Sequence, residues 1–333
     1  MRFVVLGAGA IGCYVGGRLA SNGRLVTLVG RPRVIESLRQ TGLTVTDLDG
    51  FEAHVPLPKM QLATSLAAVA MGPGDIVLLC VKGWATESAA LEIAACCPPG
   101  VTVVSLQNGV DNVARIRAIA SRVTALAALV ACNVVMPTPG RVHRATAGDL
   151  YVARTSISSE MALLFNASGL TTVLADDMRP LQWGKLLLNL NNPVNALSDL
   201  PLRAQLMDRD YRLVLAALQA EALVVMRAAG IRPARVAAVA PALLPYVLRL
   251  PNWLFRLLAA RMLRIDPLAR SSMWDDVQHG RGTEVDDLCG AVCRLAHQHG
   301  VVAPRNAAMC KLMDAHRKGR RLSGRDMRSA ALP

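Results

Sequence analysis

Short apolar runs alternate with helical patterns through the first half of the chain. The runs at residues 2–6, 25–29, 75–81 and 101–106 are rich in Val, Ile and Leu, and each ends before a glycine or a polar residue. Continuous apolar runs of this length are typical of parallel strands that are buried on both faces of a sheet. Further strands are expected at residues 123–130, 148–152 and 171–174, with a helix at 159–168 and a loop or hairpin at 137–144.

The pattern changes near residue 177, where strand signals fade and helical periodicity takes over. Amphipathic helices are predicted at residues 179–191, 208–229, 237–263, 285–299 and 307–318. A chain of 333 residues is long enough for two hydrophobic cores. The sequence therefore predicts an α/β doubly wound domain over residues 1–176 and an all-α domain over residues 177–333. The basic residues from about 316 to 333 are expected to form a solvated, mobile tail.

The first apolar run leads directly into Gly7-Ala8-Gly9-Ala10-Ile11-Gly12, a G-x-G-x-x-G pattern between a strand and a helix. In this setting the first glycine makes a tight turn, the second lets the backbone approach a pyrophosphate, and the third lets the helix pack against the strand. The helix N-terminus adds unpaired N–H groups and the positive end of its dipole. These six residues predict a dinucleotide site in a Rossmann-type domain, in preference to a simple glycine-rich turn.

The end of the second run indicates which nicotinamide cofactor binds. Proteins that bind NAD carry an acidic residue there, which holds the ribose hydroxyls. Here the run ends in Gly30-Arg31-Pro32-Arg33, without a carboxylate. Because a guanidinium suits a 2′-phosphate, the sequence favours NADPH, with Arg31 as the contact and Arg33 as a helper. The alternative is an ordinary surface arginine.

Two polar residues follow the next apolar runs. Lys82 comes after the run at 75–81, and Asn108 comes shortly after the run at 101–106. Ligands of doubly wound sheets bind outside the carboxyl ends of the strands, so both side chains are expected where cofactor and substrate meet. Asn108 precedes a glycine, however, and Asn-Gly is also ordinary turn chemistry.

The second half carries its own candidate chemistry in a leucine-rich run. Lys185 and Asn189 lie four residues apart and so share one helical face. A buried ammonium is costly unless something compensates it, and a lysine held in this way suits a general acid for a developing alkoxide. Glu284, expected in the first turn of a helix that Thr283 begins, is a candidate partner, and Ser272 is a neutral donor. Structural alternatives are a snorkelling lysine, a glutamate favoured at a helix N-terminus, and a serine cap.

Composition limits the remaining classes of function. Much of the net charge of +13 lies in the C-terminal residues from His316, but no nucleic-acid-binding signature and little aromatic interleaving accompany it. Eight cysteines occur without a C-x-x-C spacing, and no H-E-x-x-H is present, so no metal site is predicted and reduced cytoplasmic thiols are expected. No secretory signal and no uninterrupted apolar run long enough to span a membrane is found.

Taken together and in order, the motifs of both halves resemble those of the ketopantoate reductase (2-dehydropantoate 2-reductase) family. No single motif is specific, but the set extends over the whole chain. The matching residues are Gly7-x-Gly9-x-x-Gly12, Val81-Lys82, Gln107-Asn108-Gly109, Trp183-x-Lys185-Leu-x-x-Asn189, Ser271-Ser272-Met273 followed by Asp276, Thr283-Glu284-x-Asp286, and Gly300-x-x-x-Pro304-x-Asn306.

The resemblance implies NADPH-dependent reduction of 2-dehydropantoate to (R)-pantoate, a step of pantothenate synthesis. It implies that Lys185 is the general acid, that Glu284 assists it beside the nicotinamide, and that Lys82 lies near cofactor and substrate. The residues that it assigns to substrate binding are Asn108, Asn189, Ser272 and a further asparagine. Asn108 and Glu284 are also expected to contact the cofactor.

Three departures from the family pattern affect the substrate more than the reaction. The segment after Asn189 is one residue shorter than usual, so the further asparagine is open between Asn191, Asn192 and Asn195, with Asn192 taken as the candidate. Cys289 stands where the family has an asparagine. The segment 241–270 is longer and richer in Leu, Trp and Arg than in compact members. It could cover the cleft, form a homodimer contact or touch a membrane surface.

Two alternatives remain beside this reading. A related reductase could act on another 2-oxo or 3-oxo acid, which the altered asparagines and the long segment would suit. A regulator that binds NADP without catalysis would keep the glycine pattern but would not need both Lys185 and Glu284. The expected partner is a small 2-oxo acid, with neither nucleic acid nor a membrane span.

Overall fold

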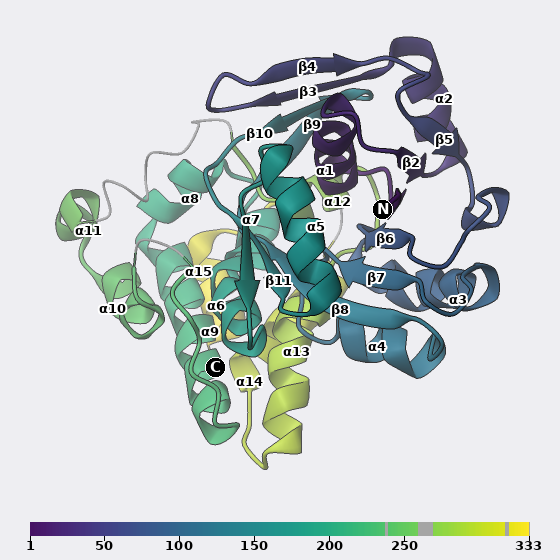
Figure 1. Cartoon of the computed structure of the whole chain (residues 1–333). Coiled ribbons are helices and arrows are strands. Elements are labelled where there is room, and N and C mark those ends of the chain that lie inside the picture. The colour runs from purple at the N-terminus through teal and green to yellow at the C-terminus, as the bar shows by residue number, and fades with distance from the viewer. Residues whose placement is uncertain (237–238, 259–268, 317–319, 333) are drawn as a thin grey trace. The chain divides into compact units, whose positions relative to one another are not determined.

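The structure, a computed structural model, describes residues 1–236, 239–258, 269–316 and 320–332. The chain divides into two compact units, Met1–Met178 and Arg179–Pro333. The first unit contains β-sheets flanked by helices, and the second is helical (Figure 1). The fold class predicted from the hydrophobic pattern is therefore confirmed.

An eight-stranded sheet forms the centre of the first unit, in the order β12-β11-β8-β7-β6-β1-β2-β5. Its strands are β1 (Phe3–Leu6), β2 (Val26–Val29), β5 (Gln61–Ala63), β6 (Ile76–Leu79), β7 (Thr102–Ser105), β8 (Thr124–Val130), β11 (Leu150–Ala153) and β12 (Thr172–Ala175). Neighbours from β5 to β8 are parallel, whereas β11 is antiparallel to β8. The strand order reverses at β1, which has β2 on one side and β6 on the other. In such sheets, ligands bind at the carboxyl ends of these strands.

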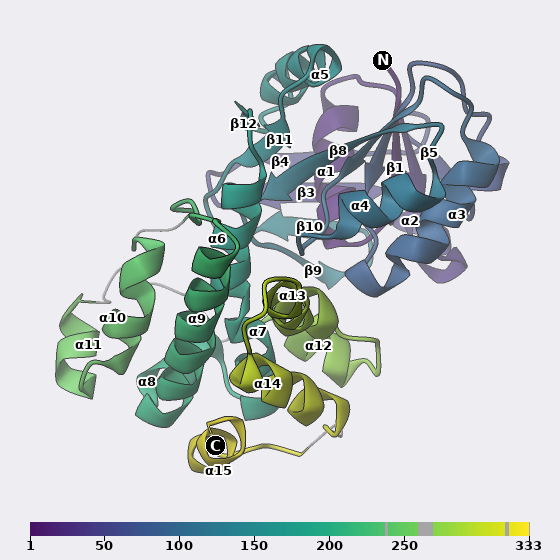
Figure 2. The ribbon, with the colours of Figure 1, turned by 90° about the horizontal axis from the view of Figure 1, so that it is seen from below.

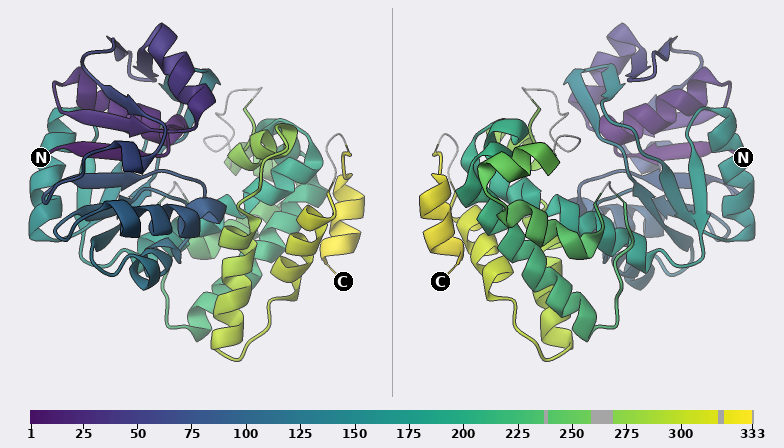
Figure 3. Two further views of the ribbon diagram at one scale, coloured as in Figure 1. Left: turned by 90° about the vertical axis from the view of Figure 1, so that its right-hand side faces the viewer. Right: turned by 90° about the vertical axis from the view of Figure 1, so that its left-hand side faces the viewer.

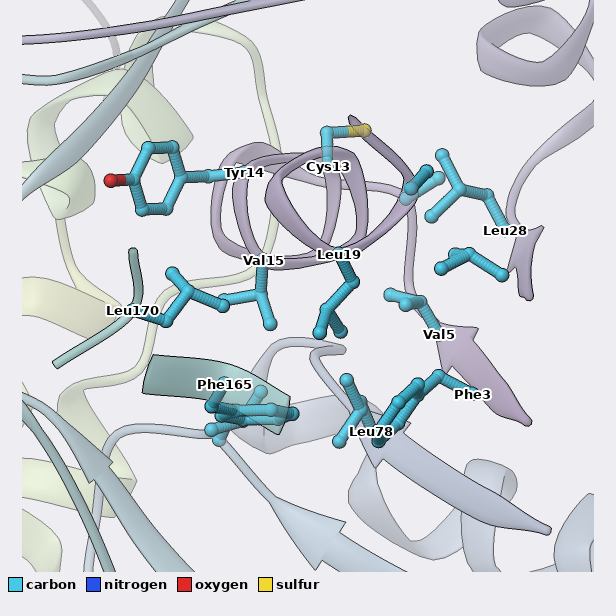
Figure 4. Close-up of a cluster of buried hydrophobic side chains, with 14 of the residues drawn as sticks. Phe3, Val5, Cys13, Tyr14, Val15, Leu19, Leu28, Leu78, Phe165 and Leu170 are labelled. Atoms are coloured by element: carbon cyan, nitrogen blue, oxygen red, sulfur yellow. The ribbon is translucent and has the colours of Figure 1, made fainter. Parts of the chain in front are cut away.

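Both faces of this sheet are covered, which explains why its central strands are uninterrupted apolar runs. In β1, Phe3 and Val5 belong to one core cluster, whereas Val4 and Leu6 belong to another. In Figure 4, Leu19 points from α1 toward the side of the cluster that holds Phe3, Leu78 and Phe165. Helices α1 (Ala10–Ser21), α2 (Pro32–Thr41) and α5 (Ser156–Ala167) contribute to the first cluster, and α3 (Thr86–Cys96) and α4 (Asn112–Ile119) to the second.

A second sheet has the order β4-β3-β10-β9, and two of its strands lie at residues for which the sequence predicted no element. The strands are β3 (Leu43–Asp47), β4 (Glu52–Val55), β9 (Val134–Thr138) and β10 (Arg141–Arg144). Strands β9 and β10 form a hairpin, one of the two alternatives left open for residues 137–144. Arg18 of α1 is joined to Asp47 of β3 by an ion pair of 2.9 Å, so this sheet is fixed to the helix that follows the glycine-rich turn.

The second unit is organised around its longest helix, α9 (Arg209–Ala228). Figure 2 shows α10 on one side of α9 and α14 on the other, and both helices contact it. The other helices are α6 (Arg179–Asn189), α7 (Asn191–Ser198), α8 (Leu202–Met207), α10 (Leu244–Arg249), α11 (Asn252–Leu258), α12 (Ser272–Gln278), α13 (Val285–Gln298), α14 (Pro304–Asp314) and α15 (Gly324–Ala331).

The expectation of a mobile basic tail after residue 316 is wrong for its last part. Residues Gly324–Ala331 form α15, which packs against α9 and α14 (Figure 3). Met327 and Ala331, four residues apart, are fully buried, and the hydroxyl of Tyr211 donates a hydrogen bond to the carbonyl of Leu322. The sequence prediction missed this helix because its apolar stripe is narrow and its other positions include arginines.

The single helix predicted at residues 237–263 is also wrong, because α10 and α11 are separate. Pro251 lies between them, and Leu250 before it has the extended conformation that a following proline favours (φ −58°, ψ 149°). Residues 237–238 and 259–263 of that prediction lie outside the described residues. No helix in the described ranges is long and apolar enough to cross a membrane.

Candidate functional site

The glycine-rich turn after β1 has the geometry that its sequence predicts. Gly7 has a φ of +114°, and a Cβ at this position would lie 2.7 Å from the backbone of Cys80 and Val81. The amides of Gly7 and Ala8 donate hydrogen bonds to the carbonyl of Val29. Only glycine can make this turn so close to the end of β6.

The other two glycines differ in what surrounds them. A Cβ at Gly12 would lie 2.1 Å from the carbonyl oxygen of Gly7, so a side chain there would separate α1 from the turn. At Gly9, by contrast, nothing lies within 4 Å of a Cβ, and no side chain caps the N-terminus of α1. Ala10 and Ile11 form the first, half-buried positions of the helix. The open space beside uncapped N–H groups fits the pyrophosphate of a dinucleotide.

Arg31 lies where β2 leads into α2, at the N-cap position of that helix. The preceding Gly30 is in close contact with the turn, because a Cβ on it would lie 2.6 Å from the Cβ of Ala8. Arg31 is exposed and its side chain has no hydrogen-bonding partner among the described residues, and Arg33 is exposed as well. This guanidinium is therefore available beside the glycine-rich turn for a phosphate group.

A buried polar network fixes the loops that carry Lys82 and Asn108. The side-chain amide of Gln107 donates to the carbonyl of Val81 (3.1 Å) and to the hydroxyl of Thr86 (2.8 Å). That hydroxyl donates to Asn112, whose amide in turn donates to the carbonyl of Asn108 (2.6 Å). The loops after β6 and β7 are thus tied together at one edge of the sheet, with Lys82 and Asn108 half-buried.

Lys185 and Asn189 lie one turn apart on α6, as predicted, but Lys185 is half-buried and not buried. Both residues are half-buried, whereas Trp183, Leu186 and Leu187 are buried. The leucine-rich sequence therefore does not bury the lysine completely.

Gly184 allows another segment to pack beside this lysine. A Cβ at position 184 would lie 2.2 Å from the carbonyl oxygen of Ala234, in the segment that follows α9. The amide of Ala234 also donates a hydrogen bond to the carbonyl of Pro180, at 2.8 Å. The backbone after α9 therefore holds the first turns of α6 in place.

The three asparagines left open by the sequence have different surroundings. Asn191 exchanges hydrogen bonds with Gln205 of α8, and the fully buried Asn195 accepts from the amide of Ser271 and donates to the carbonyl of Leu200. The side chain of Asn192 is half-exposed and has no partner among the described residues. Asn192 is therefore the asparagine of the three that is best able to contact a ligand.

Helix α12 brings Ser272 close to Asn192. The hydroxyl of Ser271 caps α12 by accepting from the amide of Trp274, and it lies 3.3 Å from the carbonyl oxygen of Asn192. Ser272, the first helical residue, is exposed. The capping role considered for Ser272 thus belongs to Ser271, and the hydroxyl of Ser272 is accessible to a ligand.

Glu284 is the N-cap of α13 and is only 5% exposed. Thr283 does not begin this helix, because α13 starts at Val285, so the predicted first-turn position of Glu284 is wrong by one residue. Cys289, which replaces the asparagine of the family pattern, is fully buried. Within the described residues, no group of three or more His, Cys, Asp or Glu side chains is placed to hold a metal ion.

The candidate residues thus form two groups, one in each unit. The first comprises the glycine-rich turn, Arg31, Lys82 and Asn108, all at the carboxyl ends of parallel strands. The second comprises Lys185, Asn189, Asn192, Ser272 and Glu284. Sequence reasoning missed Thr86 and Asn112, which help to fix the first group, because the bonds of Thr86 reach 21 and 26 positions along the chain. It also missed Gln205, which bonds to the neighbouring asparagines Asn191 and Asn195.

Comparison with known proteins yields matches over both units. Residues 3–156 match the family described as Ketopantoate reductase PanE/ApbA, and residues 177–317 match Ketopantoate reductase PanE/ApbA C terminal. A 2-dehydropantoate 2-reductase of Halobacterium salinarum is 31% identical over 312 residues, which cover 91% of this chain and 95% of the relative. A protein of the same name from Pyrococcus horikoshii is 27% identical over 95% of this chain and 97% of its own length.

Solved structures show the same architecture. A PanE/ApbA family ketopantoate reductase from Ralstonia eutropha superposes with a TM-score of 0.79 and 30% identity, over 94% of this chain and 97% of that chain. A D-mandelate dehydrogenase solved with NADH and anilino(oxo)acetate has a TM-score of 0.76 at 19% identity, over 95% of this chain and 98% of that one. The second likeness concerns the fold alone.

Proposed function

Because this chain belongs to the ketopantoate reductase family of oxidoreductases, we propose that it reduces 2-dehydropantoate to (R)-pantoate with NADPH. The observation that carries the proposal is the polar face of α6 and α7. Lys185, Asn189 and Asn192 follow one another at intervals of four and three residues, and the amide of Asn192 has no partner among the described residues. A cation followed by neutral donors suits a small, polar 2-oxo acid.

The residues of the first unit fit a nicotinamide dinucleotide. The uncapped N-terminus of α1 and the open space at Gly9 would receive the pyrophosphate, and Arg31 would bind a 2′-phosphate. When bound, the cofactor supplies a hydride to the C2 carbonyl. Lys82 and Asn108 would orient the reacting groups at the strand ends.

The residues of the second unit would handle the proton and the substrate. The Lys185 ammonium would donate a proton to the developing alkoxide oxygen and, as a cation, stabilise its charge before transfer. Asn189, Asn192 and Ser272 would donate hydrogen bonds to the substrate. Glu284 would accept a hydrogen bond from the lysine or from the substrate hydroxyl.

Steady-state kinetics followed at the nicotinamide absorbance test the reaction and its acid. We expect Lys185→Ala to lower kcat with 2-dehydropantoate by about 10²–10⁴-fold, the usual contribution of a positioned acid. The exposed Lys311→Ala is the control in the same unit and should leave kcat unchanged. Full turnover by Lys185→Ala would remove the lysine from its assigned role.

Cofactor choice is tested by comparing thermal stabilisation with NADPH and with NADH at equal concentration. We expect NADPH to stabilise the protein more, and Arg31→Ala to weaken NADPH binding by roughly tenfold or more through loss of a charged hydrogen bond. Arg39→Ala, an exposed arginine of α2, serves as the control. Stronger stabilisation by NADH would show that the inference from Arg31 is wrong.

Reduction of another 2-oxo or 3-oxo acid is the second candidate. It is favoured by Cys289, which places a buried thiol where the family has an amide. A panel of oxo acids assayed at equal concentrations distinguishes the two, since a higher kcat/KM for any of them than for 2-dehydropantoate would favour this alternative. Tight NADPH binding without turnover of any acid would instead indicate a non-catalytic regulator.

A further inference from the structure

Helices α10 and α11, with Leu243 at the N-cap of α10, expose an unusual number of large apolar side chains for two short elements. The exposed fractions are 55% for Leu243, 67% for Tyr246, and 70% for both Trp253 and Leu257. Arg249 and Arg256 are exposed among them. We call these six residues the hairpin patch. In Figures 1 and 2, α10 and α11 lie side by side.

A buried arginine of α9 fixes the inner sides of α10 and α11, the two helices that carry the hairpin patch. The Arg212 guanidinium is fully buried and donates hydrogen bonds to the carbonyls of Leu248 (3.1 Å) and Leu250 (2.9 Å) and to Asn252 (2.8 Å). It also lies over the ring of Phe255 at 4.2 Å. Because one side chain of α9 binds both helices, their exposed faces are presented in a fixed arrangement.

The exposed residues form two stripes, one from the N-cap of α10 along that helix and one on α11. Leu243, Tyr246 and Arg249 follow one another at intervals of three, and Trp253 is followed by Arg256 and Leu257 three and four positions later. These spacings place each set on one face of a helical turn. Each stripe thus combines two large apolar side chains with one arginine.

The charge of the hairpin patch indicates which kind of partner can bind it. Between Glu221 and Asp266 the sequence contains no acidic residue. Its seven arginines are Arg227, Arg232, Arg235, Arg249, Arg256, Arg261 and Arg264. A symmetric contact with a second copy would bring arginines of the patch together without any carboxylate of the patch to neutralise them, which disfavours self-association.

We propose that the hairpin patch binds the surface of a membrane that contains anionic phospholipid. Tyr and Trp favour the interface between headgroups and acyl chains, and Leu243 and Leu257 bury apolar area there. Arg249 and Arg256 lie within the same patch and meet the headgroup phosphates. The binding is peripheral and reversible, since the attachment consists of side chains of two short helices. It does not depend on the identity of the reduced substrate.

Flotation of the full-length protein with vesicles tests the proposal. We expect binding to vesicles of phosphatidylcholine with phosphatidylglycerol, weaker binding to phosphatidylcholine alone, and a decrease with added salt. Trp253→Ser combined with Leu257→Ser should weaken binding roughly tenfold or more. Arg249→Gln with Arg256→Gln should have a similar effect and leaves the apolar packing intact.

The matched control is Leu91→Ser combined with Leu163→Ser, two leucines of the first unit that are 62% and 70% exposed. This variant should bind vesicles like the unaltered protein. Absence of vesicle binding, or equal binding by the patch and control variants, would overturn the proposal. So would a dimer in sedimentation that the patch variants dissociate, because a second copy would then be the occupant. If the variant with Trp253→Ser and Leu257→Ser does not melt cooperatively, the proposal is judged from vesicle binding by the variant with Arg249→Gln and Arg256→Gln.

Discussion

At the scale of single residues, the α7 asparagines Asn192 and Asn195 differ in whether their side chains bond within the fold. Asn195 uses its amide within the fold, bonding to the amide of Ser271 and the carbonyl of Leu200, whereas Asn192 makes no such bonds among the described residues. Sequence spacing could not distinguish the two, because both belong to one short polar run. The distinction depends on partners that lie as many as 76 positions away.

Asn192→Ala should therefore change substrate binding, whereas Asn195→Ala should change stability. We expect Asn192→Ala to raise KM for the oxo acid by roughly tenfold, the value of about one hydrogen bond, with an unchanged melting temperature. Asn195→Ala should lower the free energy of unfolding by about 1–3 kcal/mol, because it leaves buried groups unpaired. Kinetics and urea unfolding of both variants provide the test. A stable Asn195→Ala with a raised KM would reverse the assignment.

The role of a single residue could be predicted from the sequence where that role depends on residues next to it in the chain. The roles of Gly7 and Gly12 follow from a turn and a helix that adjoin them in sequence, and the close contacts at both positions agree with the prediction. The network beside Lys82 and Asn108 depends instead on Thr86, an ordinary helix residue in sequence, which bonds to Asn112 26 positions away. No local pattern reveals that bond.

At the scale of elements, the closing motif Gly300-x-x-x-Pro304-x-Asn306 has a structural explanation. Pro304 occupies the first turn of α14, and the N-cap residue Ala303 has no side-chain oxygen. The buried carboxylate of Glu221 on α9 replaces the missing cap, accepting hydrogen bonds from the amides of Arg305 (3.0 Å) and Asn306 (2.8 Å). The motif therefore fixes α14 to α9.

Loss of this distant cap should destabilise the second unit. We expect Glu221→Ala to lower the free energy of unfolding by about 2–3 kcal/mol, since two helix N–H groups and the Asn306 amide lose a charged acceptor. Glu221→Gln, which keeps one acceptor oxygen, should lose less. Urea unfolding measures both, with the exposed Glu160→Ala as the control. Equal stability of Glu221→Ala and the unaltered protein would contradict the capping role.

The predicted bounds of helices and strands were wrong where a proline or a short amphipathic stretch determines where the element begins or ends. Helix α6 ends at Asn189 because Pro193 has no N–H for the carbonyl of that residue. Strand β3 alternates buried and half-buried residues over five positions, too short a pattern to recognise beside the long apolar runs. Helix α15 was concealed by its arginines.

At the scale of the whole molecule, the sequence predicted the α/β and all-α fold classes because hydrophobic periodicity extends over many residues. It did not predict how the second, smaller sheet (β4-β3-β10-β9, here the small sheet) is attached to the rest of the first unit. That attachment is a buried charge network, in which Asp47 accepts from Arg18 (2.9 Å) and Arg144 (3.4 Å). Arg18 also donates to the carbonyls of Ser168 and Gly169 after α5. One arginine thus joins α1, the small sheet and the loop after α5.

This network makes stability depend on pH. Burial by itself raises the pKa of Asp47, but hydrogen bonds from the amides of Phe51 and Asp49 and from Arg144 outweigh it and lower the pKa below its ordinary value. A carboxyl whose pKa is lower in the folded state stabilises that state above its unfolded pKa, which is about 3.9. The contribution is lost as the pH falls through the folded value.

We therefore expect Asp47→Asn to reduce the free energy of unfolding near neutral pH by roughly 3 kcal/mol, the lower end for removing one member of a buried ion pair. The same variant should lose less further stability than the unaltered protein when the pH falls below about 4, since the titrating carboxyl is gone. Asp176→Asn is the control, because Asp176 also pairs with an arginine but is 83% exposed, and such pairs contribute little. Urea unfolding followed by far-ultraviolet circular dichroism over this pH range measures all three proteins. An unchanged acid dependence in Asp47→Asn would assign the acid sensitivity to other carboxyls.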